Sequence, residues 1–189
     1  YLPLSKWIYI TYKKDNKIKI IGLSGGQGSG KSTITGILKF ILKKEYGLDL
    51  CVFSIDDFYK TKTERKKMSE KIHPLFLARG VPGTHDVELI NKTFQNLKKK
   101  VFKPILIPKF DKSADDRYKK SQWTKVRKPP HVIIFEGWCV GARHQKISNL
   151  KKSLNSLENK FDPDLKWRKR VNNHLRGHYK KLFNRIDKV

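Results

Sequence analysis

The sequence has few cysteines, few acidic residues and no long apolar run. Its two cysteines, Cys51 and Cys139, stand alone in apolar stretches, without the spacing of a metal site. No apolar run approaches the roughly 20 residues that cross a membrane. The segment Tyr1 to Ile10 is too short and too broken for a secretory signal. We therefore expect buried thiols and a cytoplasmic protein without a membrane partner; an organelle-targeting segment ahead of Tyr1 stays an open alternative.

Acidic residues are outnumbered, with 17 Asp and Glu against 43 Lys and Arg, which gives a net charge of +26. Such an excess is typical of proteins that bind nucleic acid or acidic surfaces. The basic residues are spread along the chain, however, and no RNP-like pattern or helix-turn-helix signature accompanies them. We favour a lysine-rich bias of solvated faces over a nucleic-acid partner. The length predicts a single domain over residues 1–189, large enough to bury a core.

A glycine-rich segment organises the chain. Residues 25–32 read G-x-x-x-x-G-K-S, the pattern of a phosphate-binding loop. An apolar strand is predicted before it at 18–23, and an amphipathic helix after it at 31–46, with Gly47 as its stop. Glycines let backbone N–H groups surround an anion at the start of a helix. We expect ATP to be bound by Gly25, Gly26, Gln27, Gly28, Ser29, Gly30, Lys31, Ser32 and Thr33.

Two acidic positions follow predicted strands. The apolar run at 50–55 ends at Asp56 and Asp57, and the run at 132–135 ends at Glu136. Ligands of an open α/β sheet bind beyond the carboxyl ends of its strands, so these carboxylates should face the phosphate loop. In phosphoryl transfer, Lys31 would reach the β/γ-phosphates, and Ser32 and Glu136 would hold Mg²⁺.

Asp56 is the preferred base for the acceptor hydroxyl. Its rival is Asp57, because alternation along a strand turns one of the two away from the crevice. The competing interpretation makes both residues helix caps or solvated loop residues, and makes Glu136 a structural carboxylate at a strand end.

The remaining pattern predicts alternating elements. We expect a helix after Asp86, a short strand within 104–108, and a long helix from about Pro163. Residues 1–16 have no clear register, and 61–80 and 142–160 read as helix and loop. The whole indicates an α/β fold of the P-loop NTPase type, three layers with a mainly parallel sheet and helices on both faces. The last residues, 185–189, read as the opening of another strand, so we expect the domain to be incomplete there.

Several polar residues are candidates for the acceptor side. His85 and Asp86 follow a Pro-Gly turn and read either as a substrate-facing pair or as a helix cap. A charged set follows at Lys109, Asp111 and Arg117. These residues either bind an anionic or polyhydroxy acceptor or form a charge cluster on the surface. Tyr59, in the same segment as Asp56, joins the predicted acceptor residues.

Other histidines and tryptophans receive a plainer interpretation. His174 and His178 lie one helical turn apart but lack the glutamate of H-E-x-x-H, so we expect surface or groove histidines. Trp138 and Trp167 are interpreted as core residues rather than stacking platforms.

Five segments occur in an order that resembles a known family. They are residues 24–33, 54–59, 79–86, 108–113 and 135–138. Together they are similar to the D-glycerate 3-kinase group of the phosphoribulokinase/uridine kinase/pantothenate kinase family. The similarity continues through the short segments at 162–164, 167–168, 171–172 and 185–187, so it covers nearly the whole chain.

The resemblance implies transfer of the γ-phosphoryl group of Mg·ATP to a small-molecule hydroxyl, with D-glycerate as acceptor. It also implies that Asp56 is the base, that Glu136 supports the metal, and that the His-Asp pair and the Lys/Arg segment lie on the acceptor side. Relatives usually have a glycine-containing insert before the Asp-Arg of the acceptor loop, whereas here 113–117 runs straight on. Relatives also continue past this terminus into a further strand.

Two alternatives stay open. In the first alternative, the fold is the same but the acceptor is a nucleoside, pantothenate or a sugar phosphate. In the second, the chain is an ATP-binding protein with a nucleic-acid or acidic partner. The oligomeric state is unknown.

Overall fold

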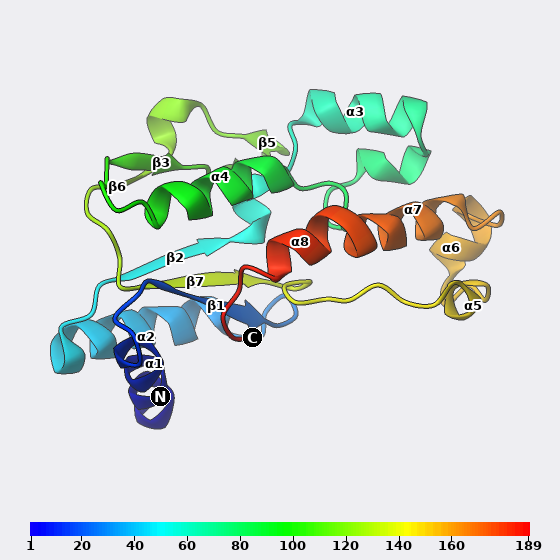
Figure 1. Ribbon diagram of the computed structural model, residues 1–189. Helices are drawn as coiled ribbons and strands as arrows, with labels where there is room; N and C mark the ends of the chain where they lie inside the picture. The colour runs from blue at the N-terminus through cyan, green and yellow to red at the C-terminus, as the bar shows by residue number, and fades with distance from the viewer.

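The computed structural model describes all residues, Tyr1–Val189. Three parallel strands form its centre in the order β1 (Lys19–Ser24), β7 (Val132–Gly137) and β2 (Leu50–Ser54) (Figure 1). The register sets Ile20 opposite Ile133 in one pair and Phe53 opposite Phe135 in the other. The central strand β7 is almost entirely buried, as expected for a strand paired on both edges and covered on both faces.

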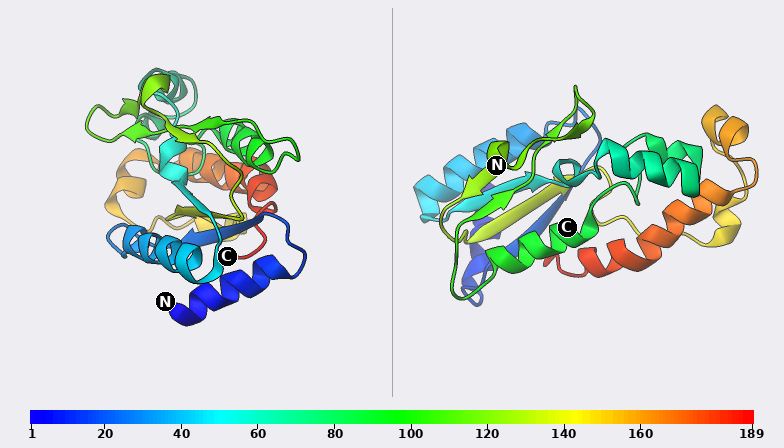
Figure 2. Two further views of the ribbon diagram at one scale, coloured as in Figure 1. Left: turned by 90° about the vertical axis from the view of Figure 1, so that its left-hand side faces the viewer. Right: turned by 90° about the horizontal axis from the view of Figure 1, so that it is seen from above.

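Alternate residues of β7 supply two separate cores. Val132 and Ile134 pack with residues of α1 (Leu2–Lys13) and α2 (Lys31–Tyr46), which lie together on one face of the sheet (Figure 1). Ile133 and Phe135 pack on the opposite face, against α4 (Val87–Leu97) and the chain leading to α8 (Lys180–Phe183). Figure 2 shows the same layers from two further directions. The predicted three-layer α/β arrangement with helices on both faces is confirmed.

The N-terminal helix α1 was missed by sequence reasoning. It buries Ser5, Ile8 and Thr11, two of which are small and polar, so the apolar periodicity of the segment is weak. In contrast, α2 ends where predicted, because Gly47 adopts the left-handed conformation at its C-cap (φ 65°).

A smaller group of elements lies on the same side of the sheet as α4 (Figure 1). It contains α3 (Lys62–Lys71), the 3₁₀ turn η2 (Pro74–Leu77) and two short antiparallel pairs. The pairs are β3 (Ile105–Ile107) with β6 (Thr124–Val126), and β4 (Phe110–Asp111) with β5 (Asp116–Arg117). The fully buried Arg65 joins these parts, because its guanidinium donates to the carbonyls of Leu77 and Asp115.

The last part of the chain has the helix and loop predicted near 142–160 and the long helix predicted from about Pro163, which runs over residues 166–183 with a π-helical turn inside it. Two short helices, α5 (Ile147–Leu150) and α6 (Ser156–Phe161), come before α7 (Lys166–His174). A π-helical turn, η4 (Leu175–Tyr179), then separates α7 from α8. The backbone of Lys188 pairs in parallel with β1, so the predicted opening of another strand is confirmed. No helix is both long and apolar enough to cross a membrane.

Candidate active site

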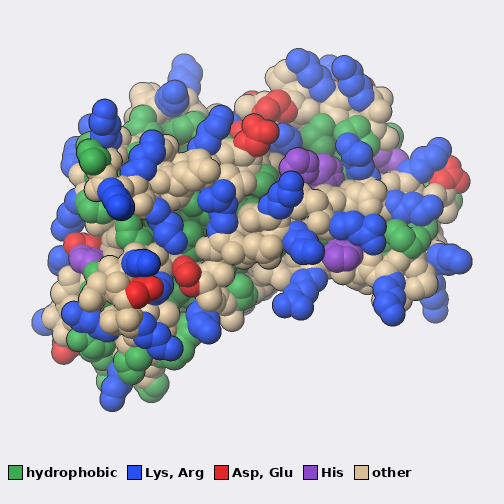
Figure 3. Space-filling model, in the orientation of Figure 1, with side chains coloured by type: hydrophobic (Ala, Val, Ile, Leu, Met, Phe, Trp, Pro, Cys, Tyr) green, Lys and Arg blue, Asp and Glu red, His purple; other side chains and the backbone are tan.

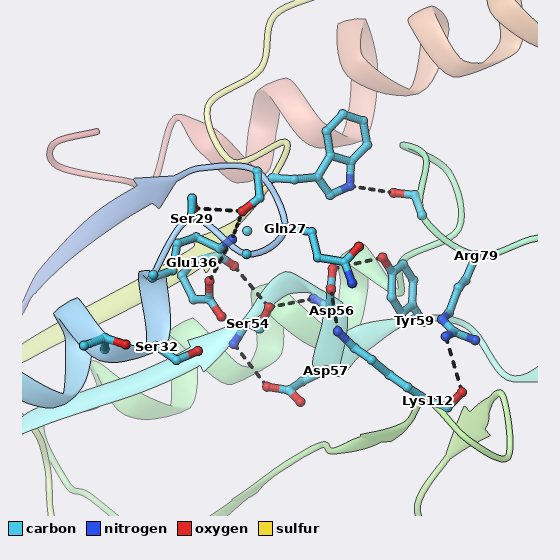
Figure 4. A pocket seen from close by; sticks show the side chains of 18 residues that line it. Gln27, Ser29, Ser32, Ser54, Asp56, Asp57, Tyr59, Arg79, Lys112 and Glu136 are labelled. Atoms are coloured by element: carbon cyan, nitrogen blue, oxygen red, sulfur yellow. Dashed lines mark hydrogen bonds and ion pairs between the residues drawn. The ribbon is translucent and has the colours of Figure 1, made fainter.

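A cavity of about 840 Å³ opens at the carboxyl ends of the three central strands (Figure 4). The phosphate loop and the turn after β2 form two of its walls, and the end of β7 and the acceptor-side loops complete it. Its lining consists of residues 26–33, Ser54, Asp56, Asp57, Tyr59, Arg79, Gly80, Lys112 and residues 136–138. The sequence-predicted positions Lys31, Asp56 and Glu136 therefore meet in one space.

The phosphate loop connects β1 to α2 through two glycines in the left-handed region. Gly28 has φ 76° and Gly30, the N-cap of α2, has φ 77°, conformations that other residues adopt only with strain. Lys31 Nζ donates to the carbonyls of Gly25 (2.8 Å) and Gly26 (2.7 Å), so the ammonium lies against the loop. A Cβ at Gly25 would meet Ser29 Oγ at 2.8 Å, so the loop is folded too tightly there for a side chain.

Glu136 supplies a carboxylate at the end of β7. Its Oε2 atom is buried, accepts no hydrogen bond and lies 4.0 Å from Lys31 Nζ. A buried carboxylate oxygen without a donor is costly, and a hard cation that prefers oxygen ligands would relieve that cost. Ser32 lines the same cavity at the start of α2. No cluster of three or more potential metal ligands is present, so Mg²⁺ would need phosphate and water oxygens as well, which suits its chemistry.

The two aspartates after β2 are held differently, but strand alternation, which we expected to turn one of them away from the crevice, does not apply to them. The strand ends at Ser54, and a 3₁₀ turn, η1 (Ile55–Phe58), follows instead of continued alternation. Asp57 Oδ2 accepts from the Ser54 backbone N–H (3.1 Å) as part of a capping box, and burial raises the pKa of Asp57. Asp57 is therefore the capping-box partner of the N-cap Ser54, which agrees for this one residue with the competing interpretation that made both aspartates caps.

Asp56 faces the cavity with both carboxylate oxygens held. Oδ1 accepts from the Tyr59 hydroxyl (2.9 Å), and Oδ2 lies 3.4 Å from Lys112 Nζ (Figure 4). Its side chain is 27% exposed, so it is open to a ligand in the cavity. Asp56 is thus open to the cavity, whereas Asp57, which also lines it, uses one carboxylate oxygen to hold the Ser54 N–H.

The predicted pair of His85 and Asp86 does not line the cavity. His85 is only 2% exposed, stacks on the Tyr59 ring, and burial lowers its pKa to about 3. Asp86 caps α4, because its Oδ1 accepts from the Leu89 N–H (3.0 Å). Of the two interpretations, the structure fits the helix cap for Asp86, and it puts His85 behind Tyr59, outside the cavity lining.

The charged set at Lys109, Asp111 and Arg117 is also outside the cavity lining. Lys109 is exposed beside Tyr118, and Asp111 accepts from Ser113 and Ala114 in a local turn. Arg117 donates to the Tyr59 carbonyl (2.8 Å), so it supports the wall from behind. None of these three side chains lines the cavity, so the structure does not support direct contact between them and an acceptor bound there.

Sequence reasoning missed Arg79 and Lys112, two cations that line the cavity in addition to Lys31. Arg79 forms an ion pair with Asp115 and lies over the Phe110 ring (5.5 Å). The available signal was their position inside two of the family-like segments, 79–86 and 108–113. Trp138 is likewise corrected from core to cavity wall, since it is 49% exposed and its Nε1–H donates to the Gly80 carbonyl (3.0 Å).

Known proteins share this sequence and architecture. The chain is 33% identical over 187 residues to an uncharacterized kinase of Schizosaccharomyces pombe, covering 94% of this chain and 65% of that one. It is 32% identical over 168 residues to the chloroplastic D-glycerate 3-kinase of Arabidopsis thaliana, covering 85% of this chain and 34% of that one. The solved D-glycerate 3-kinase of Cryptococcus neoformans has a TM-score of 0.80 at 28% identity, over 97% of this chain and 68% of that one.

The chain spans about two thirds or less of the length of these curated relatives. A family model described as "Phosphoribulokinase / Uridine kinase family" covers residues 20–181. That range contains the phosphate loop, the Asp56 turn, the acceptor-side loops and the end of β7. The chain therefore belongs to the phosphoribulokinase/uridine kinase family of P-loop kinases.

Proposed function

We propose that this chain is a kinase that transfers the γ-phosphoryl group of Mg·ATP to a hydroxyl of a small anionic molecule, with D-glycerate as the favoured acceptor. The observation that carries the proposal is the meeting of Lys31, Glu136 and Asp56 in one cavity on a phosphate loop. Each has a different role in phosphoryl transfer: a cation for phosphate charge, a carboxylate for the metal, and a base.

Asp56 accepts the proton of the acceptor hydroxyl in this proposal. The hydroxyl oxygen forms a bond to the γ-phosphorus, the bond to the oxygen bridging the β- and γ-phosphates breaks, and ADP leaves with that electron pair. The Tyr59 hydroxyl and Lys112 hold the two oxygens of Asp56, which fixes the carboxylate toward the cavity. Lys31 can move from the loop carbonyls to the transferring phosphate.

Mg²⁺, when bound by Ser32 and Glu136, would neutralise charge on the β- and γ-phosphate oxygens. The buried, unpartnered Oε2 atom of Glu136 supports this assignment.

The acceptor side favours a small anion. Arg79 and Lys112 provide positive charge there, and a carboxylate is a natural partner for a guanidinium. The D-glycerate 3-kinases among the relatives support glycerate in particular. A nucleoside is the second candidate, because Trp138 presents an aromatic ring in the cavity and a uridine kinase of Ligilactobacillus salivarius is 32% identical over 127 residues.

Release of ADP from Mg·ATP tests the proposal when it is measured with D-glycerate, uridine, pantothenate or a sugar phosphate, and without an acceptor. We expect stimulation that is greatest with D-glycerate. Greater stimulation by uridine would move the proposal to the second candidate, and stimulation by no hydroxyl acceptor would contradict a small-molecule kinase.

A nucleic-acid partner has less support. Figure 3 shows Lys and Arg side chains scattered over the visible face among other residue types instead of gathered in one groove. RNA binding that changes with ATP and falls steeply with added salt would favour a nucleic-acid partner instead.

Burial raises the pKa of the unpaired thiols of Cys51 and Cys139 to about 11 and about 12, respectively. Both values support unreactive cysteines, and we propose a cytoplasmic location on this basis.

A further inference from the structure

A buried tyrosine from the far end of the chain connects to the proposed base through two aromatic rings. Tyr179 is fully buried, and its Oη lies 2.6 Å from His85 Nδ1. The His85 ring stacks on the Tyr59 ring with centroids 4.5 Å apart and planes 22° apart. The Tyr59 hydroxyl in turn donates to Asp56 Oδ1 (2.9 Å). The contacts run without a gap from the C-terminal helices to the base.

Tyr179 hydrogen-bonds to two groups of the 83–85 segment. Its Oη accepts from the Gly83 backbone N–H (2.9 Å), and we assign its own hydrogen to the bond with His85 Nδ1. In this assignment Nδ1 of the neutral imidazole accepts, and the ring proton resides on Nε2. Nε2 is buried and has no partner, so the Tyr179 hydroxyl is the one group that holds the imidazole by a hydrogen bond.

The π-helical turn brings Tyr179 to this position. One α-helical residue advances about 100° around the axis, and a π-turn accommodates one residue more than an α-turn. Without the turn at Leu175–Tyr179, the tyrosine would rotate away from His85 by about that angle. Such turns occur frequently at functional sites. This one places the buried Tyr179 hydroxyl against His85, which lies behind the Tyr59 wall of the cavity.

Tyr59 is held on three sides, which makes it sensitive to the position of His85. Its backbone forms a bridge with that of His85, its ring packs edge-on against Phe110 (5.2 Å), and its carbonyl accepts from Arg117. The stacked imidazole closes the remaining face of the ring. A shift of His85 therefore moves the Tyr59 hydroxyl relative to Asp56.

We propose that Tyr179 is a positioning residue for the reaction: by holding His85 against Tyr59, it sets the hydrogen bond between Tyr59 and the base Asp56. This inference rests on the proposed kinase function and extends it to a residue outside the cavity. Tyr179 itself does not touch the substrate. It acts through His85 and Tyr59 only.

A double-mutant cycle on kcat tests the proposal in the full chain. Tyr179→Phe retains the ring but removes the hydroxyl, and Tyr59→Phe removes the last hydrogen bond of the series. We expect Tyr179→Phe to lower kcat roughly tenfold, because a small displacement near a reacting group is costly. KM for ATP should not change. The double variant should be no slower than Tyr59→Phe alone, since both changes remove the same hydrogen bond.

The matched control is Tyr46→Phe, a tyrosine that stacks on Tyr9 at the end of α2, remote from the cavity. It should leave kcat unchanged. Additive losses in the double variant, or a full kcat in Tyr179→Phe, would overturn the positioning role while leaving the kinase proposal intact. Absence of turnover in the wild-type chain with every hydroxyl acceptor would overturn the kinase proposal itself.

A measurement without turnover tests the contact directly. The ¹⁵N chemical shifts of His85 should report a neutral ring with its proton on Nε2, and the Nδ1 shift should change in Tyr179→Phe. A ring proton on Nδ1, or identical shifts in the two proteins, would overturn the proposal even if Tyr179→Phe proved too unstable for kinetics.

Discussion

Glu136 Oε2 lies 4.0 Å from Lys31 Nζ and accepts no hydrogen bond, although both side chains are largely buried. Lys31 begins α2, after the phosphate loop that follows β1, and Glu136 lies near the end of β7. The parallel pairing of β1 with β7 brings the two side chains together. The two side chains thus form a long ion pair on the wall of the cavity. We propose that Mg²⁺ and the terminal phosphates bind in the cavity beside this pair.

Glu136→Gln should weaken the dependence of ATP binding on Mg²⁺. Loss of a charged metal partner typically costs roughly 10- to 100-fold in metal affinity. Calorimetric titration with ATP, with and without Mg²⁺, measures this independently of turnover. The control is Glu88→Gln, an exposed residue in the first turn of α4. Equal Mg²⁺ dependence in wild type and Glu136→Gln would remove Glu136 from the metal site.

Lys112→Met should raise KM for the acceptor while KM for ATP stays constant. The side chain is 60% exposed, so we expect an effect of about fivefold, as for a solvent-screened ion pair. Lys109→Met is the matched control, because Lys109 is exposed outside the cavity lining. A larger rise in the acceptor KM for Lys109→Met than for Lys112→Met would favour the prediction from sequence that Lys109 binds the acceptor, and would contradict the role given to Lys112.

Gly137→Ala should destabilise the fold and lower activity together. A Cβ at this position would lie 2.3 Å from Ile55 Cγ2, so the end of β7 would separate from the turn that holds Asp56. We expect a loss of about 1–3 kcal/mol in the free energy of unfolding, typical of overpacking. Gly36→Ala has open space within α2 and should stabilise by about 0.5–1 kcal/mol instead. Urea unfolding of both variants and of wild type measures these changes. A Gly137→Ala variant as stable as wild type would contradict the close approach of Ile55 to Gly137.

Asp162→Asn should destabilise the protein and alter its response to acid. The Asp162 side chain is fully buried and accepts from the Trp167 N–H (2.8 Å) and from Arg168 Nε (2.9 Å). Burial raises the pKa of Asp162, but these bonds outweigh it and hold the pKa below its usual range. Removing one partner of a buried pair costs about 3 kcal/mol or more.

The sign of the pH effect follows from the lowered pKa. The stabilisation from Asp162 is complete above about pH 4, the ordinary value, and is lost as the pH falls through the lowered folded-state pKa. Thermal unfolding between pH 7 and pH 2 should therefore show a steeper acid loss in wild type than in Asp162→Asn. The control Asp164→Asn changes an exposed carboxylate and should follow wild type. If the unfolding temperatures of wild type and Asp162→Asn fall in parallel with pH, the stabilising role of the Asp162–Arg168 ion pair is contradicted.

The fold and the phosphate side of the site were predictable because both depend on local patterns. The G-x-x-x-x-G-K-S segment dictates a turn between strand and helix, and Asp56 and Glu136 follow directly from apolar runs that could only be buried strands. The topology then brings the strand ends to one edge.

The acceptor side was not predictable in the same way. Whether His85 or Arg79 faces the cavity depends on packing between segments far apart in sequence, such as the contact of His85 with Tyr179. The π-turn and the two-residue strands β4 and β5 leave no periodic signal. The family-like segments marked the correct loops, but not the side chains within them that line the cavity.

The central claim is that Asp56 is the base of a glycerate-dependent kinase, and the neighbouring aspartates allow a sharp test. ADP release from Mg·ATP with D-glycerate is measured for wild type, Asp56→Asn and Asp57→Asn, with ATP affinity measured in parallel. We predict that Asp56→Asn loses at least about 100-fold in kcat, the scale of a general base, with ATP affinity unchanged. Asp57→Asn, which keeps an acceptor for the Ser54 cap, should retain turnover. Full glycerate-dependent turnover in Asp56→Asn, or a loss confined to Asp57→Asn, would contradict the account.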